Sequence, residues 1–592
     1  MAAKKRQKRA EQALKTEQRT MPKYRVRRWV LLTLLSLSSV VLVYRAVDQQ
    51  IFETDFLQRE GQRRHLRVVE MTANRGMITD RHGEPLAMST PVDSIWANPR
   101  VLSPDAKTLM PLAKALGKDV DELRRLLAKR SDRSFVYLQR RVNPDLAEKV
   151  DELDIKGVEL QREYRRFYPA GEVSAHVVGF TDVDDIGQEG LELAYQDWLQ
   201  GTNGKKRVIR DGRARAVKDV ENIQKTEPGK ALTLSIDRRL QFLAYRELKA
   251  AVKHNKAKSG SAVILDVRTN EVLAMVNQPA YNPNGSKRGK PGRFRNRAVT
   301  DVFEPGSTMK PMTISAALDS GHYRAESVID TAPGYYRVGR NQVKDHRNYG
   351  ALDIAGVIRK SSNVGVSKIA LSMPKEELFD FFSRLGFGEP TSTGFPGESG
   401  GQLTPPGRWA KIDQATLSFG YGLSVTPLQL ARAYSVLAAD GVRRPVSLIK
   451  REQAPEGDRV MRASTAKTVR KMMEAVATAE GTAPKAAIPG YRVAGKTGTA
   501  KKSVSGGYAD DRYRSVFAGM VPASDPRLVM VVMIDDPSAG QYYGGQVAAP
   551  VFSKVMGGAL RLLNIPPDDL PNGGIRLADL KTSLTTNLGG AQ

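Results

Sequence analysis

The hydrophobic pattern of the chain begins with one apolar run behind a strongly basic segment. Residues 1–28 contain eleven Lys or Arg and two Glu, and residues 29–47 follow as a nearly uninterrupted apolar stretch. A helix of that length spans roughly 28 Å at about 1.5 Å per residue, enough for the hydrocarbon core of a bilayer. The pattern predicts a basic tail at 1–28 and a transmembrane anchor at 29–47, with a cleaved signal peptide as the competing interpretation.

The charges on either side of the apolar run predict its orientation. Lys and Arg in short segments next to a transmembrane helix favour the cytoplasmic side. We therefore expect a single-pass protein whose N-terminus lies in the cytoplasm and whose chain after residue 48 lies outside it.

Behind the anchor, the pattern of apolar and polar positions changes near Pro228. Residues 48–228 mix strand-like pieces with helical ones, and the break at Pro228-Gly229 opens a new pattern. The sequence turns polar again near its end. We predict a first domain at 48–228, a second at 229–564 and a mobile tail at 565–592.

Short apolar runs in the second domain predict its sheet. A helix begins at Asp237, and most of the sequence up to about residue 480 is helical in pattern. Strand-like runs lie at 262–265, 272–276, 491–494, 515–521 and 528–534. Early strands that complete a sheet formed by late ones are typical of an α+β domain, in which helices cover an antiparallel sheet. In the first domain, Pro111 predicts a kink or a break in the helical run 106–116.

Composition narrows the possible chemistry. The chain has no cysteine, which excludes disulfides and thiolate metal sites. Neither His176 nor His346 lies in the pattern of a catalytic triad, and the sequence predicts no metal and no cofactor. The net charge of +28 would suit nucleic acid, but the predicted topology, with the chain after residue 48 outside the cytoplasm, argues against that partner. A basic external surface suits anionic lipid headgroups and a carboxylate-rich cell wall, or is a solvated charged face.

The stretch 304–311 places a hydroxyl and an amine about one helical turn apart. Pro305-Gly306 ends any preceding element, so Ser307 opens a helix, and residues three apart share a helix face. A serine hydroxyl needs a base to become a good nucleophile, and a lysine kept neutral by burial or nearby cations can act as one. The sequence predicts acyl transfer in which Ser307 attacks and Lys310, reaching back to it, takes the proton.

The Ser-x-x-Lys spacing alone is weak evidence, because it occurs four times, at Ser307, Ser372, Ser447 and Ser464. The last three have ordinary explanations, as a turn, an extended segment and a helix cap. Only Ser307 is followed by a Ser-x-Asn motif, Ser361-Ser362-Asn363, and then by Lys496-Thr497-Gly498-Thr499. The three motifs in this order occur once.

This ordered trio resembles the signature of penicillin-binding proteins and serine β-lactamases. The first domain extends the resemblance to class B penicillin-binding proteins, the monofunctional transpeptidases, through the stretches 74–83, 166–169, 175–180 and 187–192. Together with 516–522, these stretches are closest to the division-specific septal peptidoglycan D,D-transpeptidase of the FtsI type. The implied fold is an α+β penicillin-recognising domain preceded by a mixed α/β pedestal of the dimerisation type and one N-terminal transmembrane helix.

The resemblance also implies a role for each motif residue. Ser307 attacks the carbonyl between two terminal D-alanines of a peptidoglycan stem peptide, and an amine of a second strand then resolves the acyl-enzyme. Ser361 relays a proton with Lys310, and Asn363 binds the amide of the donor peptide. In the last motif, Lys496, Thr497 and Thr499 hold the terminal carboxylate, and Gly498 leaves room for the extended peptide. The N–H groups of Ser307 and Thr499 form the oxyanion hole.

The family further implies surroundings and partners. They are the inner membrane of a bacterium, a periplasmic catalytic domain, β-lactam antibiotics as inhibitors, and septal membrane proteins that include a lipid-linked glycan polymerase.

Three other functions stay open at this point. The elongation-type transpeptidase shares the architecture, a D,D-carboxypeptidase or β-lactamase uses the same nucleophile, and a receptor binds β-lactams without turnover. The large pedestal favours transfer to an amine, although Glu376 and Glu377 remain candidates for a base that activates water. A receptor needs a cytoplasmic effector, which a tail of residues 1–28 is too short to form.

Overall fold

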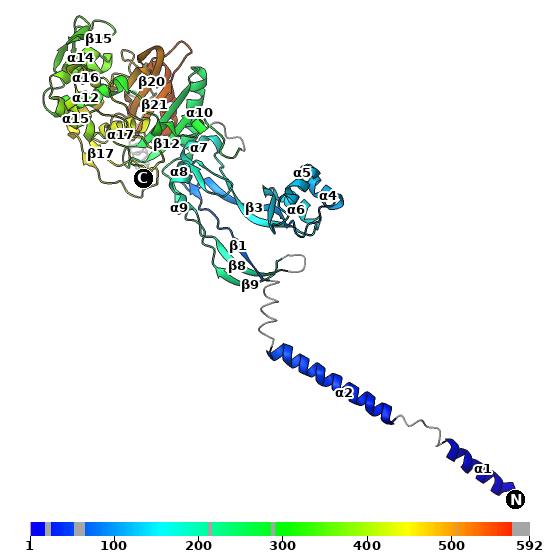
Figure 1. The fold of residues 1–592 in the computed structure, drawn as a ribbon. Helices are drawn as coiled ribbons and strands as arrows, with labels where there is room; N and C mark the ends of the chain where they lie inside the picture. The colour runs from blue at the N-terminus through cyan, green and yellow to red at the C-terminus, as the bar shows by residue number, and fades with distance from the viewer. Residues whose placement is uncertain are drawn as a thin grey trace, which may run out of the picture.

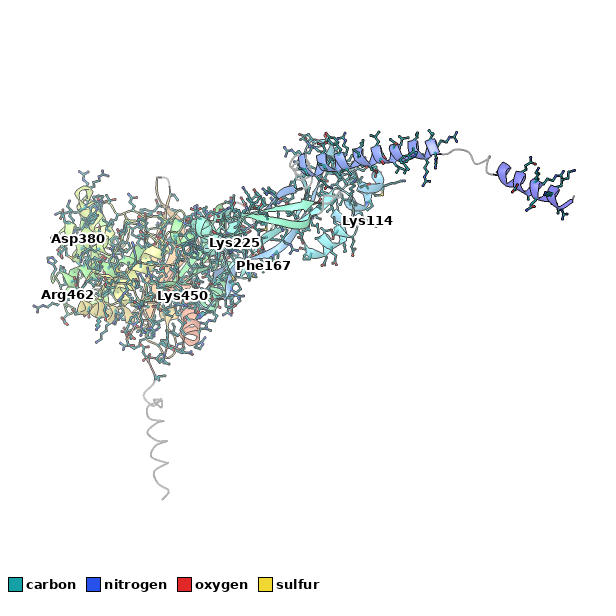
Figure 2. All side chains as sticks on the ribbon, turned by 90° about the horizontal axis from the view of Figure 1, so that it is seen from below. Lys114, Phe167, Lys225, Asp380, Lys450 and Arg462 are labelled. Carbon is teal, nitrogen blue, oxygen red and sulfur yellow. The ribbon has the colours of Figure 1, made fainter. Side chains whose placement is uncertain are left out.

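The computed structural model describes residues 2–17, 25–52, 66–210, 216–285, 291–504 and 506–570. Two helices stand apart from the rest, α1 (Ala2–Glu17) and α2 (Arg25–Val47), and the π-helix η1 (Asp48–Phe52) continues α2 (Figure 1). No residue of α2 is buried, and its side chains reach out on all sides (Figure 2). Within these ranges one helix is long and apolar enough to cross a membrane, Arg25–Ile51, and its 18-residue apolar window has a mean hydropathy of 2.0.

The pedestal, the described residues from 66 to 228, lies between α2 and the second domain (Figure 1). Next to α2, an antiparallel sheet has the order β1-β8-β9 and consists of β1 (Leu66–Met71), β8 (Gly204–Arg210) and β9 (Ala216–Gln224). A second sheet has the order β10-β2-β3-β4, with β5 also paired to β3. Its strands are β2 (Ile78–Thr79), β3 (Pro85–Ala97), β4 (Val136–Val142) and β5 (Val158–Phe167), joined by β10 (Leu232–Thr233), which lies just beyond residue 228.

Three helices enclose a small hydrophobic core against β3, β4 and β5: α4 (Ala106–Leu116), α5 (Val120–Ala128) and α6 (Pro144–Asp151). The helix α4 continues through Pro111, so the break predicted at this proline is absent. Leu109, Leu112 and Leu116 are buried on one side of α4. Their burial contributes about 5 kcal/mol or more, which exceeds the roughly 3 kcal/mol that a proline costs inside a helix.

A buried network of charged side chains joins three distant segments of the pedestal. Glu192 is fully buried and accepts hydrogen bonds from Arg75 Nε at 2.6 Å and from Arg166 Nε at 2.7 Å. Each of these residues comes from one of the stretches that resemble class B penicillin-binding proteins. Three of the four pedestal stretches therefore have a structural reason, because each of the three supplies one member of a single ion network.

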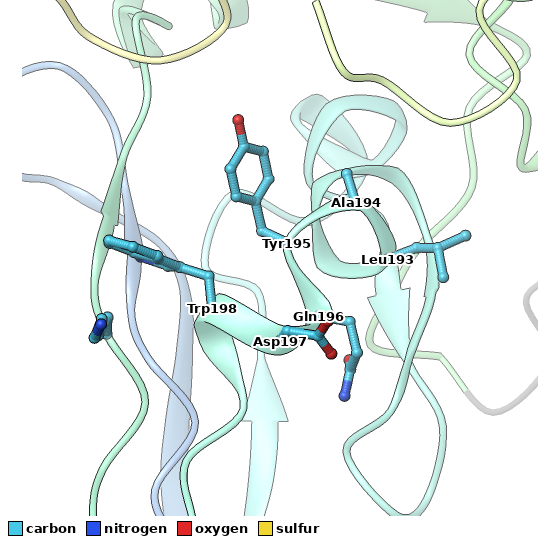
Figure 3. Close-up of a pocket in the computed structure, with 7 residues that line it drawn as sticks. Leu193, Ala194, Tyr195, Gln196, Asp197 and Trp198 are labelled. Atoms are coloured by element: carbon cyan, nitrogen blue, oxygen red, sulfur yellow. The ribbon is translucent and has the colours of Figure 1, made fainter.

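A hollow of about 410 Å³ opens on the pedestal beside Trp198 (Figure 3). Lys230 Nζ lies 4.7 Å from the centre of the Trp198 ring, and the indole N–H donates to the Ala231 carbonyl at 3.1 Å. Leu193 and Tyr195 complete its apolar lining. None of the predicted site residues lines this hollow, so it is separate from the site described below.

The second domain is built on a five-stranded antiparallel sheet in the order β12-β11-β21-β20-β19. Its strands are β11 (Ser259–Asp266), β12 (Val272–Gln278), β19 (Ala494–Val504), β20 (Gly507–Val521) and β21 (Leu528–Asp535). The early pair completes a sheet formed by the late strands, as predicted. The strand predicted at 491–494 is misplaced, since β19 begins at Ala494. Lys and Gly in the following motif are weak strand formers, and this hid the strand from the sequence pattern.

Helices cover both faces of this sheet, as the complete burial of β12 and β21 requires. The sheet packs against α10 (Arg238–His254), α17 (Pro427–Ala438), α18 (Ala463–Glu474) and α20 (Ala549–Leu562). A further helical layer lies on the side of the sheet away from the pedestal (Figure 1). It contains α12 (Lys310–Asp319), α13 (Ile354–Lys360), α14 (Asn363–Leu371), α15 (Lys375–Arg384) and α16 (Lys411–Leu417).

The first residues of the predicted tail are held against the second domain. The Tyr491 hydroxyl donates to the Ile565 carbonyl at 2.6 Å, and the Arg492 N–H donates to Asp568 at 2.8 Å. The rest of the tail, residues 571–592, lies outside the described residues. Its predicted mobility stays a prediction.

Candidate active site

The predicted nucleophile lies on a short 3-10 helix beside the edge strand β19. This helix, η4 (Gly306–Met309), carries Ser307 and leads directly into α12. Gly306 has a φ of 57°, and its N–H donates to the Gly420 carbonyl at 3.1 Å. A Cβ on Gly420 would lie 2.2 Å from the Gly306 oxygen, so the close approach of the two segments requires glycine there. Ser307 itself is half-buried and keeps one side open.

Lys310 begins α12 and is fully buried, but its amine does not reach back to Ser307 as predicted. The Nζ donates to Asn363 Oδ1 at 2.7 Å, to Ser361 Oγ at 3.0 Å and to the Ser361 carbonyl. Among the described residues, Ser307 Oγ makes no hydrogen bond. The spacing of the first motif places Lys310 one helical turn from Ser307. The hydrogen-bond acceptors of the Lys310 amine come instead from the second motif, from Ser361 and Asn363.

The Ser-x-Asn motif forms the link between two helices. Ser361 ends α13 in the left-handed conformation, with φ 58° and ψ 42°, and Ser362 caps α14 by accepting from the Gly365 N–H at 2.8 Å. Asp345, which the sequence analysis missed, accepts from the Ser362 hydroxyl at 2.5 Å and from the Val364 N–H at 3.0 Å. It lies in a loop with no motif around it. Asp345 therefore fixes the turn that aims Ser361 and Asn363.

Lys496 approaches the same hydroxyl from the opposite side of the site. It is fully buried on β19, and its Nζ donates to Ser361 Oγ at 2.9 Å. The Lys310 amine lies 3.0 Å from that oxygen. The Ser361 hydroxyl thus joins the two lysines, and the structure brings all three motifs together around it.

Burial lowers the pKa of both lysines. Desolvation lowers the pKa of Lys496 to about 7. For Lys310, desolvation is again the largest cause, the charge of Lys496 lowers the pKa further, and Asp345 opposes them; the result lies well below 10.5. A lowered pKa increases the fraction of neutral lysine, which is the form that can accept a proton.

The last motif forms the wall of the site on the edge strand. A Cβ on Gly498 would lie 2.7 Å from the Pro305 oxygen, so the glycine is needed for η4 to pack on β19. This is a reason beyond the predicted room for a peptide. Thr497 Oγ1 lies 2.9 Å from Thr482 Oγ1, and Thr499 Oγ1 accepts from the Gly544 N–H at 3.1 Å. Both hydroxyls are therefore oriented by neighbouring segments.

Aromatic side chains flank the site, and the two histidines considered above differ in setting. The Tyr542 ring stacks on Tyr513 with ring centres 4.1 Å apart, and the His346 ring centre lies 6.3 Å from that of Tyr543.

His176 is buried, its Nε2 is 2.9 Å from the Arg293 carbonyl, and desolvation lowers its pKa to about 4. His176 thus has a structural place between the pedestal and the second domain.

Comparison with known proteins agrees with this geometry. Residues 260–557 match the penicillin-binding protein transpeptidase domain, and residues 70–234 match the penicillin-binding protein dimerisation domain. The chain belongs to the penicillin-binding protein transpeptidase family. This penicillin-binding protein is 47% identical over 543 residues to the peptidoglycan D,D-transpeptidase FtsI of Escherichia coli (strain K12), which covers 91% of this chain and 92% of that one. It is 43% identical over 530 residues to the probable peptidoglycan D,D-transpeptidase PenA of Neisseria gonorrhoeae, covering 89% and 91%.

Solved structures of the family give the same picture of the fold. Penicillin-binding protein 3 of Mycobacterium tuberculosis, complexed with aztreonam, is 30% identical with a TM-score of 0.66, covering 84% of this chain and 98% of that one. The transpeptidase domain of Burkholderia pseudomallei penicillin-binding protein 3 is 46% identical with a TM-score of 0.53, covering 57% and 98%. The predicted α+β class with a pedestal is confirmed. The apolar N-terminal helix and the similarity to FtsI fit a membrane-anchored protein.

Proposed function

We propose that this protein is a septal peptidoglycan D,D-transpeptidase, which cross-links stem peptides during cell division and is inhibited by β-lactams. One observation carries the proposal: two buried lysines of lowered pKa converge on the Ser361 hydroxyl, and the half-buried Ser307 lies on η4, which packs against the strand of Lys496 and leads into the helix of Lys310. This arrangement supplies a neutral base next to a nucleophile. The names of the relatives, FtsI and PenA, supply the substrate class.

In the proposed acylation, Ser307 Oγ attacks the carbonyl between the two terminal D-alanines. Its proton passes to the neutral Lys310 amine and on through Ser361 to the nitrogen of the leaving D-alanine. Asn363 binds the amide of the donor peptide, and Lys496 with Thr497 and Thr499 binds its terminal carboxylate. The N–H groups of Ser307 and Thr499 form the proposed oxyanion hole, and Gly498 leaves the strand edge open to the peptide. The reaction needs no cofactor.

We also propose the topology and the division of labour along the chain. Residues 1–28 lie in the cytoplasm, 29–47 cross the inner membrane, 48–228 form the pedestal and 229–564 carry the periplasmic transpeptidase, with a tail at 565–592. The pedestal and anchor contact other septal membrane proteins, among them a lipid-linked glycan polymerase. Support comes from the basic N-terminal tail and from the free surface of α2.

A fluorescent penicillin tests the proposed nucleophile. We expect the full-length chain in detergent to form a stable covalent adduct, seen by gel and intact mass, and Ser307→Ala to form none. The matched control is Ser464→Ala, since Ser464 is an exposed serine of another Ser-x-x-Lys sequence and should label normally. Labelling of folded Ser307→Ala, or no labelling of the wild type, would contradict the proposal.

The rate of loss of the adduct separates transfer from the nearest alternative. A β-lactamase would release the penicilloyl group quickly, whereas a transpeptidase should keep it over many minutes. Rapid turnover of benzylpenicillin would favour the hydrolase.

A further inference from the structure

The carboxylate of Glu304, three residues before Ser307, has no part in the mechanism above. Its Oε1 accepts hydrogen bonds from the Gly422 N–H at 2.9 Å and from the Tyr508 hydroxyl at 3.0 Å. Its Oε2 is buried and has no hydrogen-bond partner among the described residues. A buried carboxylate oxygen without a donor is unfavourable, so its position calls for an explanation.

The backbone holds Glu304 at a fixed position relative to the nucleophile. The Phe303 N–H donates to the Val425 carbonyl, and the Val425 N–H donates to the Phe303 carbonyl, both at 2.9 Å. Two residues after Glu304, the Gly306 N–H donates to the Gly420 carbonyl. The carboxylate therefore lies in the same rigid turn that presents Ser307, next to the segment 420–425.

Tyr508 covers this carboxylate from the tip of a strand pair. Residues 507–513 of β20 pair with β19 alone, because β21 begins its pairing with β20 at Arg514. A two-stranded extension is only marginally stable by itself. Its tip is fastened by the Tyr508 hydroxyl on Glu304 and by the Tyr508 ring, which packs on Tyr421 with ring centres 5.6 Å apart.

We infer that Glu304 binds the amine of the acceptor strand, and that Tyr508 covers this acceptor subsite until the amine displaces it. The inference deepens the proposed function and rests on it. The donor peptide ends in a carboxylate, which Glu304 repels. The acceptor brings an ammonium group, which can donate a charge-assisted hydrogen bond to the unpartnered Oε2.

The chemical step balances with groups already named. The bound ammonium gives one proton to the neutral Lys310 amine, and its nitrogen then attacks the carbonyl of the Ser307 ester. The new C–N bond forms, the C–Oγ bond breaks, and the second proton of the nitrogen goes to Ser307 Oγ. The products are the amide cross-link, free Ser307 and a protonated lysine.

Two variants separate the charge of Glu304 from its hydrogen bond to Tyr508. Glu304→Gln keeps an oxygen for Gly422 and Tyr508 but removes the charge, whereas Tyr508→Phe keeps the charge and removes the bond. The full-length protein is given an acyl-D-alanyl thioester as donor and D-alaninamide as acceptor, and mass spectrometry measures the ratio of amide to hydrolysis product. Glu452→Gln, at an exposed position outside the predicted site, is the matched control.

We expect Glu304→Gln to lower the ratio of amide to acid about tenfold or more, with acylation by fluorescent penicillin within about twofold of wild type. Tyr508→Phe should keep or raise the ratio, because the subsite opens while the charge remains. An unchanged ratio of amide to acid in Glu304→Gln would overturn the inference. An equal fall of the ratio in Glu304→Gln and Tyr508→Phe would also overturn it, because it would mean that the hydrogen bond between the two residues only stabilises the strand pair. Failure of the wild type to acylate at all would instead count against the proposed function.

Discussion

Each domain of this protein buries a pair of cationic side chains, and the two pairs are compensated in opposite ways. In the pedestal, Arg75 and Arg166 share the carboxylate of Glu192, and all three are nearly or fully buried. In the second domain, Lys310 and Lys496 share only the Ser361 hydroxyl, and neither forms an ion pair among the described residues. The arginine pair is neutralised by a carboxylate in direct contact, whereas the lysine pair has no carboxylate within ion-pair distance among the described residues.

Under the proposed mechanism, burial serves stability in the pedestal and reactivity at the site. Arginine keeps its charge under almost all conditions, so a buried arginine pair needs a carboxylate. Lysine can lose its proton, and an uncompensated site lowers its pKa until it does. The residue types therefore match their tasks: a permanent ion network in the pedestal and a titratable pair at the nucleophile.

Lys310→Arg should have the largest effect, because it converts the reactive pair into one that cannot release a proton. Loss of a general base costs about 10²- to 10⁴-fold in rate, and we expect the second-order rate constant for acylation by fluorescent penicillin to fall by that factor. Lys471→Arg, at an exposed position on α18, is the control. A fall of less than about threefold in folded Lys310→Arg would remove Lys310 from the role of base.

Glu192→Gln breaks the other pair by leaving two arginines without their counter-ion. Removing one partner of a buried ion network typically destabilises a protein by about 3–5 kcal/mol. We expect a clear fall in the melting temperature and a matching rise in proteolysis of the pedestal, with near-normal acylation by the molecules that remain folded. Glu221→Gln is the control, since its pair with Arg207 is exposed and worth less than about 1 kcal/mol. Equal melting temperatures for the two variants would contradict the assigned stability role.

Lys496→Met should change stability in the opposite direction. The pKa of Lys496 is lowered to about 7 in the folded state, against an ordinary value of 10.5, so folding opposes protonation of this group. The penalty is complete below about pH 7 and disappears as the pH rises toward 10.5. We expect Lys496→Met to raise the free energy of unfolding by about 1–4 kcal/mol at pH 6 and by less at pH 9. A melting temperature that falls at pH 6 would contradict this.

The same physical differences explain which features of the site the sequence can predict. The meeting of Ser361 and Lys496 followed from the order of the motifs, whereas the predicted roles of Ser307, Ser361 and Lys496 stay predictions. The hydrogen-bond partners of Lys310 were not, since sequence spacing places a long side chain near the serine without choosing its acceptor. Asp345 was missed because a loop carboxylate that orients a turn has no motif.

The same limit applies to the fold. The antiparallel sheet and its early strand pair followed from apolar runs, whereas the beginning of β19 did not, because packing against η4 overrides the weak strand preference of Lys496 and Gly498. The pedestal network joins residues far apart in sequence, and no local pattern pairs Arg75 with Glu192.

Lys496→Arg should have the smallest effect on the rate of acylation. It should remove the titration of residue 496 from the pH dependence, so that only Lys310 of the two lysines still titrates. In the wild type, binding of a substrate carboxylate needs charged Lys496, so acylation should decline above about pH 7, by up to about tenfold per pH unit. Arginine stays charged, and the variant should lose this decline even if its maximal rate is lower. A decline above pH 7 that persists in Lys496→Arg would assign it to another group.

The most direct test of the account is the pH dependence of Ser307 acylation in Lys496→Arg, measured with fluorescent penicillin from pH 5 to 10.5. Arginine at position 496 stays charged over this pH range. The increase of the acylation rate constant with pH then reports the deprotonation of Lys310 alone. The account predicts that the rate constant reaches half its maximum well below pH 10.5, the ordinary value for a lysine. A rise centred near pH 10.5 would contradict the claim that an uncompensated buried lysine pair activates the serine.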